Sequence, residues 1–65
     1  MLATYDWYKG YFIKYEKVNG RYACYIWSGN RLISEGDLVA DSVFSAYDLA
    51  VDFIDEMDYT LVANI

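Results

Sequence analysis

Residues 11–27 read Tyr11-Phe-Ile-Lys-Tyr-Glu-Lys-Val-Asn-Gly-Arg-Tyr-Ala-Cys-Tyr-Ile-Trp27, and this stretch decides the fold. Aromatic and β-branched residues, which favour strands, lie on both sides of the central Asn19-Gly20 pair. An Asn-Gly pair between two such runs favours a tight hairpin turn, because both turn residues need a positive φ angle. The sequence therefore predicts two antiparallel strands, at about residues 9–18 and 21–28.

A second turn signal, Gly29-Asn30, leads into a third run at about residues 31–36, which Gly36-Asp37 should end. The prediction is an α+β domain built on a three-stranded antiparallel meander. Counting outward from the two turns gives the expected pairs: Val18 with Arg21, Tyr15 with Cys24, Ile13 with Ile26, Trp27 with Leu32, and Ile26 with Ile33.

Because side chains alternate along a strand, this pairing divides the sheet into two faces. The inner face carries a row of isoleucines flanked by aromatic residues and a cysteine: Ile13, Ile26 and Ile33 with Tyr11, Tyr15, Tyr22 and Cys24. The outer face mixes apolar and charged residues: Phe12, Trp27 and Leu32 with Lys14, Glu16, Ala23 and Tyr25. We expect the inner face to form the core.

Residues 42–57 have the periodicity of an amphipathic helix, and Asp41 or Ser42 can cap its N-terminus. Its apolar face consists of Val43, Ala46, Tyr47, Ala50, Phe53, Ile54 and Met57. This face should pack on the isoleucine row, which gives a two-layer domain.

The two ends of the chain carry weaker signals. Residues 59–65 could form a short fourth strand, while residues 1–8 could extend the first strand or fold over the outer face. The whole chain, residues 1–65, should form a single domain, since 65 residues are too few for two.

The charges are divided unequally along the chain. All five bases lie in residues 1–31 with two acids, whereas residues 32–65 hold eight acids and no base, for a net charge of −5.

The chain has one cysteine and no histidine, which excludes an internal disulfide and nearly excludes a structural zinc site. We expect no metal and no cofactor. No run approaches the ~20 apolar residues that span a membrane, so we expect an intracellular, cytoplasmic protein.

Two residues are candidates for catalysis, and neither is strong. Cys24 lacks a histidine to act as its base, and its inner position indicates a buried structural thiol. Glu35 is expected on the inner face beside Cys24 and Tyr15, where a carboxyl could serve as an acid, although an edge position reaching water is the simpler interpretation. We therefore expect that the protein is not an enzyme.

The helix carries an acidic ridge of Asp48, Asp52, Asp55 and Glu56, spaced so that neighbours lie on one side. No base within the helix relieves their repulsion. One hypothesis is that the ridge imitates the phosphates of nucleic acid and binds a basic cleft in a protein partner. The alternative is a solvated face that keeps a hydrophobic protein in solution.

The outer sheet face is the second candidate, with Phe12, Tyr25, Trp27 and Leu32 as an apolar patch. Exposed patches of this kind mark protein interfaces, here with a partner or in a homodimer. The alternative is that one end of the chain covers the patch. Direct binding of nucleic acid to these aromatic residues is disfavoured by the negative net charge.

The segments Tyr8-Lys-Gly-Tyr-Phe-Ile13, Glu35-Gly36 and Phe53-Ile-Asp-Glu56 resemble a pattern seen in many short phage and bacterial proteins. In size, acidity and lack of catalytic groups the chain is similar to phage-encoded inhibitors, including anti-CRISPR proteins and DNA-mimicking glycosylase inhibitors. The resemblance implies a non-enzymatic inhibitor of a nucleic-acid-handling host protein that acts in the host cytoplasm. From the spacing of the acids, we expect the acidic ridge to be the surface that binds this protein. The alternative is a small homo-oligomeric interaction protein that associates through its aromatic sheet face or an edge strand.

Overall fold

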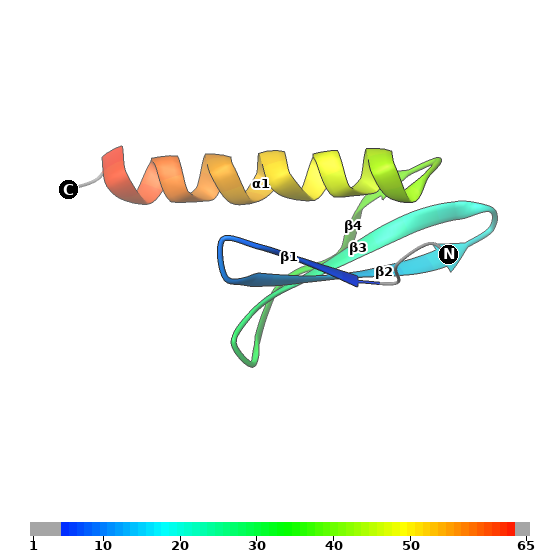
Figure 1. The fold of residues 1–65 in the computed structure, drawn as a ribbon, viewed down its shortest axis with the longest axis horizontal. Helices are drawn as coiled ribbons and strands as arrows, with labels where there is room; N and C mark the ends of the chain where they lie inside the picture. The colour runs from blue at the N-terminus through cyan, green and yellow to red at the C-terminus, as the bar shows by residue number, and fades with distance from the viewer. Residues whose placement is uncertain (1–4, 64–65) are drawn as a thin grey trace.

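The computed structural model describes residues 5–63, with side chains described through residue 58. It contains four strands followed by one helix: β1 (Tyr5–Tyr8), β2 (Tyr11–Val18), β3 (Arg21–Ser28), β4 (Arg31–Ala40) and α1 (Val43–Ala63). The strands form one antiparallel sheet in the order β1-β2-β3-β4, and α1 lies along one face of it (Figure 1). The predicted α+β class is confirmed, and the sheet has four strands where three were predicted.

Two of the turns have the backbone that tight hairpins require. Asn19 and Gly20 have φ angles of 52° and 80°, and the predicted β2–β3 register is confirmed throughout. Lys9 and Gly10 have φ angles of 50° and 83° and join β1 to β2 in the same way. The sequence does not signal this hairpin, because lysine is not among the residues that favour positive φ. Residues 5–8 therefore add a strand at the edge of the sheet, while residues 1–4 lie outside the described part of the chain.

The register between β3 and β4 departs from the prediction after its first pairs. Trp27 lies opposite Leu32 as predicted, but Ile26 lies opposite Ser34 rather than Ile33. A β-bulge places one extra residue on β4, and beyond it every side chain of the strand changes face relative to a regular count. Bulges depend on packing across the sheet, so pair counting from a turn does not detect them.

The predicted end of the third run at Gly36-Asp37 is wrong, because β4 continues to Ala40. Gly36 has a φ angle of 75° and lies within a second irregularity of the register. The ring of Tyr25 covers it, since a Cβ added to Gly36 would lie 3.2 Å from that ring. An aromatic side chain over a strand glycine protects the exposed backbone there, so Gly36 bends the strand without ending it.

Helix α1 begins as predicted. The Ser42 hydroxyl accepts a hydrogen bond from the Ser45 amide at 3.1 Å, and the Ser42 carbonyl accepts one from the Ala46 amide at 2.9 Å. Ser42 is therefore the N-cap. The other predicted cap, Asp41, instead accepts a hydrogen bond from Arg21 at 3.0 Å.

The helix continues well beyond its predicted end at residue 57. The fourth strand predicted at 59–65 is wrong for residues 59–63, which belong to α1, and residues 64–65 lie outside the described part of the chain. No glycine or proline follows residue 57, and adding a turn to an existing helix needs no new nucleus. At 21 residues α1 is about 31 Å long, and its C-terminal turns project past the β1–β2 turn (Figure 1).

The core lies between α1 and the inner sheet face, as the sequence predicts. Ile13 and Ile26 on the sheet and Ile54 on the helix are fully buried. Ala46 and Ala50 on the helix are also fully buried, and such small side chains let a helix approach a sheet closely. Aromatic and aliphatic side chains surround this core, namely Tyr8, Tyr11, Tyr22, Ile33, Leu38, Val43, Tyr47 and Phe53.

Candidate interaction surfaces

The outer sheet face carries two rows of side chains that cross all four strands. The strand pairing aligns Trp7, Phe12, Trp27 and Leu32 in an apolar row. It aligns Tyr5, Lys14, Tyr25 and Glu35 in a neighbouring mixed row. We call these eight residues the outer face. Predicted patch residues Phe12, Tyr25, Trp27 and Leu32 thus lie together, and β1 adds two aromatic side chains that the sequence analysis did not place there.

Trp7 and Tyr5 of β1 are the most exposed aromatic side chains of the outer face. Trp7 is 64% exposed and Tyr5 is 53% exposed. Both rings pack on Phe12, with ring centroids 5.0 Å apart for Trp7 and 5.6 Å apart for Tyr5. These contacts hold the two rings in place while most of their surface meets solvent.

A shallow hollow of about 480 Å³ lies next to Trp7 on the outer face, lined by Trp7, Phe12, Lys14, Trp27 and Gly29. A smaller hollow of about 160 Å³ adjoins it and is lined by Lys14, Glu16, Tyr25 and Trp27. This side of the sheet is therefore not flat, and its two hollows combine apolar rings with one lysine, Lys14, and one glutamate, Glu16.

No described element covers the outer face. Helix α1 packs on the opposite side of the sheet, and residues 5–8 lie within the sheet instead of folding over it (Figure 1). The residues of the predicted C-terminal strand that the structure describes, 59–63, belong to the helix layer. Over the described part of the chain, the sheet is a single layer with one solvent-facing aromatic side.

The four residues of the predicted acidic ridge do not share one environment. Asp48, Asp52 and Glu56 are exposed on α1, whereas Asp55 is partly buried against the β1–β2 hairpin. At a 100° step per residue, Asp55 lies on the side of the helix toward β1, so its carboxylate is within reach of the sheet. Asp48 and Asp52 remain neighbours one helical turn apart.

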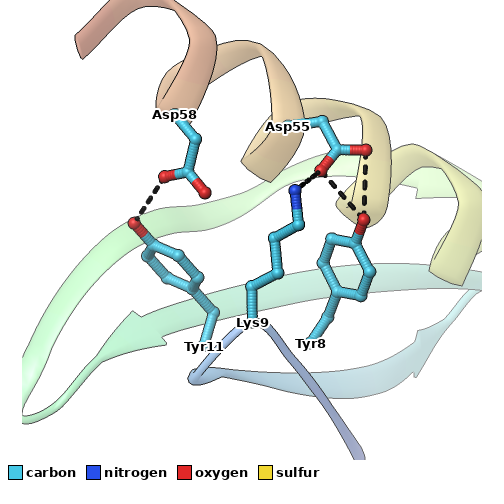
Figure 2. A network of polar contacts seen from close by, with 5 residues as sticks. All are labelled: Tyr8, Lys9, Tyr11, Asp55 and Asp58. Carbon is cyan, nitrogen blue, oxygen red and sulfur yellow. Dashed lines mark hydrogen bonds and ion pairs between the residues drawn. The ribbon is translucent and has the colours of Figure 1, made fainter. Parts of the chain in front are cut away.

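Asp55 belongs to a cluster of polar contacts that we call the hairpin clasp, composed of Tyr8, Lys9, Tyr11, Asp55 and Asp58 (Figure 2). The Tyr8 hydroxyl donates to the two Asp55 oxygens at 2.9 and 3.1 Å, and Lys9 Nζ lies 2.8 Å from Asp55 Oδ1. One turn along, the Tyr11 hydroxyl donates to Asp58 at 3.2 Å. The clasp joins the β1–β2 hairpin to the second half of α1.

The clasp changes the acid–base properties of its members. Hydrogen bonds from Lys9 and then Tyr8 hold the pKa of Asp55 below its ordinary value. The same bonds raise the pKa of Lys9 and of Tyr8 above their ordinary values. The Asp55 charge is thus matched within the chain by Lys9, and its carboxylate is occupied by contacts that stabilise the fold.

The two candidate catalytic residues lie apart. Cys24 is buried as predicted, its thiol donates to the Ala46 carbonyl at 3.2 Å, and burial raises its pKa to about 11. Glu35 is exposed on the outer face opposite Tyr25, so its predicted inner position is wrong. The cause is the bulge in β4, which reverses the alternation beyond Ile33.

Among the described residues, no group of three histidine, cysteine or acidic side chains is placed to hold a metal ion. Within the same part of the chain, no helix is long and apolar enough to cross a membrane. No protein-family model matches the chain, and neither a curated protein nor a solved structure matches it.

Proposed function

We propose that this chain is a non-catalytic protein-binding module whose main binding surface is the outer face. The observation that carries the proposal is the exposure of Trp7 and Tyr5 beside Phe12 and Trp27 on an open sheet face. Tyrosine and tryptophan are the residues most often found at the energetic centres of protein interfaces. A contiguous exposed patch of aromatic side chains on a small domain is typical of a protein-binding site.

The binding free energy that each candidate surface can supply favours the outer face over the acidic ridge. Covering the exposed parts of Trp7 and Tyr5 removes roughly 250 Å² of largely apolar surface from water, worth about 6 kcal/mol before the cost of association. An exposed ion pair, which is what Asp48 or Asp52 would form, contributes typically below about 1 kcal/mol. In addition, Asp55 of the predicted ridge is bound within the hairpin clasp and is not available to a partner.

Site-specific photo-crosslinking tests this proposal. A photoreactive phenylalanine analogue replaces Tyr25 on the outer face in one variant and Phe44 on α1 in the other. Phe44 is the matched control, because it is a helix residue whose aromatic side chain is 74% exposed. We expect protein adducts, with the same chain or another, from position 25 and few from position 44. Adducts from position 44 alone, or from neither position, would contradict the proposal.

A second candidate function is inhibition of a nucleic-acid-handling protein through the acidic helix surface. Asp48 and Asp52 are both exposed, and α1 carries five acids and no base in its sequence. Such a surface could occupy a cleft that normally binds phosphates. A phage origin, a nucleic-acid-handling target and a cytoplasmic location stay predictions from the sequence.

The Asp48→Lys, Asp52→Lys double variant distinguishes this second candidate from the first. Partners are captured from bacterial lysate at low salt, eluted at high salt and identified, with Trp7→Glu tested in parallel. A basic nucleic-acid-binding protein that the double variant loses and Trp7→Glu retains would support mimicry. Retention of the same partner by the double variant would rule it out.

A further inference from the structure

We propose that the partner of the outer face is a second copy of this chain, packed face to face as a two-fold dimer. This inference rests on the proposed function, since it names the occupant of the same surface. Three properties of the surface lead to it: its shape, its charge and its size.

The outer face carries a large exposed ring and a shallow hollow side by side. Trp7 stands 64% exposed at the edge of the 480 Å³ hollow that Phe12, Lys14, Trp27 and Gly29 also line. A projecting ring and a hollow that lie side by side on one face can each meet the other across a two-fold axis. This is the requirement for a closed dimer, in which residue i contacts residue j and j contacts i. The hollow is large enough to receive an indole ring.

The distribution of charge directs a second copy to the sheet side of the molecule. The paired strand positions of this side hold two bases and two acids: Lys14, Arg21, Glu16 and Glu35. Helix α1 carries five acids and no base. Two chains of net charge −5 repel each other least when their helices are far apart. Face-to-face packing of the sheets achieves this, because the sheets then separate the two helices (Figure 1).

The size of the face is adequate for a specific dimer. Four strands about 4.8 Å apart, the inner ones spanning about 26 Å, give a face of roughly 500 Å² in projection. This projection covers the whole outer side of the sheet, and its accessible area is larger because side chains project from it; a small specific interface buries about 600 Å² per partner and a standard one ~800 Å². An interface of ~800 Å² would cover about one sixth of the 4730 Å² that the chain exposes. A domain of 65 residues has a small core, and oligomerisation is a common way to stabilise such domains.

Sedimentation velocity over a range of concentrations tests the dimer. We expect the wild-type chain of 7.6 kDa to sediment at twice that mass, and Trp7→Glu to sediment as a monomer. Phe44→Glu is the matched control, since it places the same new charge on an exposed aromatic position of the helix layer and should leave the dimer intact. Far-UV circular dichroism checks that each variant is folded, and Lys14→Glu provides a second interface variant if Trp7→Glu unfolds.

The outcomes separate this inference from the proposed function. A wild-type chain that stays monomeric at its highest attainable concentration overturns the dimer. If crosslinks from position 25 then join the chain to a different protein, the protein-binding function stands with another occupant. A dimer that Phe44→Glu dissolves and Trp7→Glu preserves overturns the assignment of the dimer to the outer face.

Discussion

At the scale of single residues, Cys24 shows how packing decides the chemistry of a reactive group. The thiol lies under α1, donates to a helix carbonyl and is closed to solvent. Burial disfavours the charged thiolate, which is the reactive form. The same side chain on the outer face would be a candidate nucleophile, so its position on the inner face is what makes it structural.

Labelling of Cys24 by a thiol reagent should be slow in the folded protein. Burial raises its pKa from 9.0 to about 11, and at pH 8 this lowers the thiolate fraction by about 100-fold. We expect labelling by a disulfide reagent to be at least that much slower in buffer than in denaturant. The two rates are followed by absorbance, and comparable rates in the two solvents would contradict a buried thiol.

At the scale of elements, two hairpin turns, one strand bend and the helix start each have an identifiable local cause. Positive φ angles at Asn19-Gly20 and Lys9-Gly10 make the hairpins, and Gly36 under the Tyr25 ring bends β4. The start of α1 depends on one side chain, because the Ser42 hydroxyl satisfies a free backbone amide of the first turn. These junctions are where single substitutions should have their clearest effects.

Substitutions at Asp41 and Ser42 distinguish which of these two predicted residues caps the helix. Ser42→Ala should lower the free energy of unfolding by about 1 kcal/mol. For a domain of this size that loss corresponds to a fall in Tm of about 4–8 °C. Asp41→Ala, which removes only an exposed ion pair with Arg21, should have a smaller effect. Chemical denaturation of both variants measures this, and a larger loss for Asp41→Ala would contradict the assigned cap.

At the scale of the whole molecule, we expect the hairpin clasp to make stability depend on pH. The pKa of Asp55 is lowered from 3.8, so its carboxylate stabilises the fold at pH values above that point. This stabilisation is lost as the pH falls below 3.8 toward the folded pKa. On the alkaline side, the pKa values of Tyr8 and Lys9 are raised from 10.0 and 10.5, so their contribution is complete below about pH 10 and is lost above it.

Thermal unfolding of Asp55→Asn across this range tests the clasp. We expect the variant to have a lower Tm than the wild type at pH 7, with a difference that shrinks as the pH falls below 3.8. Asp52→Asn is the matched control, because it removes one charge from an exposed position of the same helix. If the two variants give identical pH curves, Asp55 has no special role in the fold.

The chain by itself determines the features that depend on neighbours in sequence. The register of β2 with β3, the capped start of α1 and the two apolar faces that form the core follow from turn residues and from periodicity. These signals act over a few neighbouring residues, so they can be recognised in the amino-acid sequence alone.

Only the tertiary structure decides the features that depend on contacts across the fold. The bulge in β4 moves Glu35 to the outer face, and the hairpin clasp binds Asp55, which therefore does not belong to the exposed acidic surface. Each of these is the outcome of packing between segments up to 47 residues apart. The physical reason is that alternation and spacing specify which face a side chain takes, whereas long-range packing decides what it meets there.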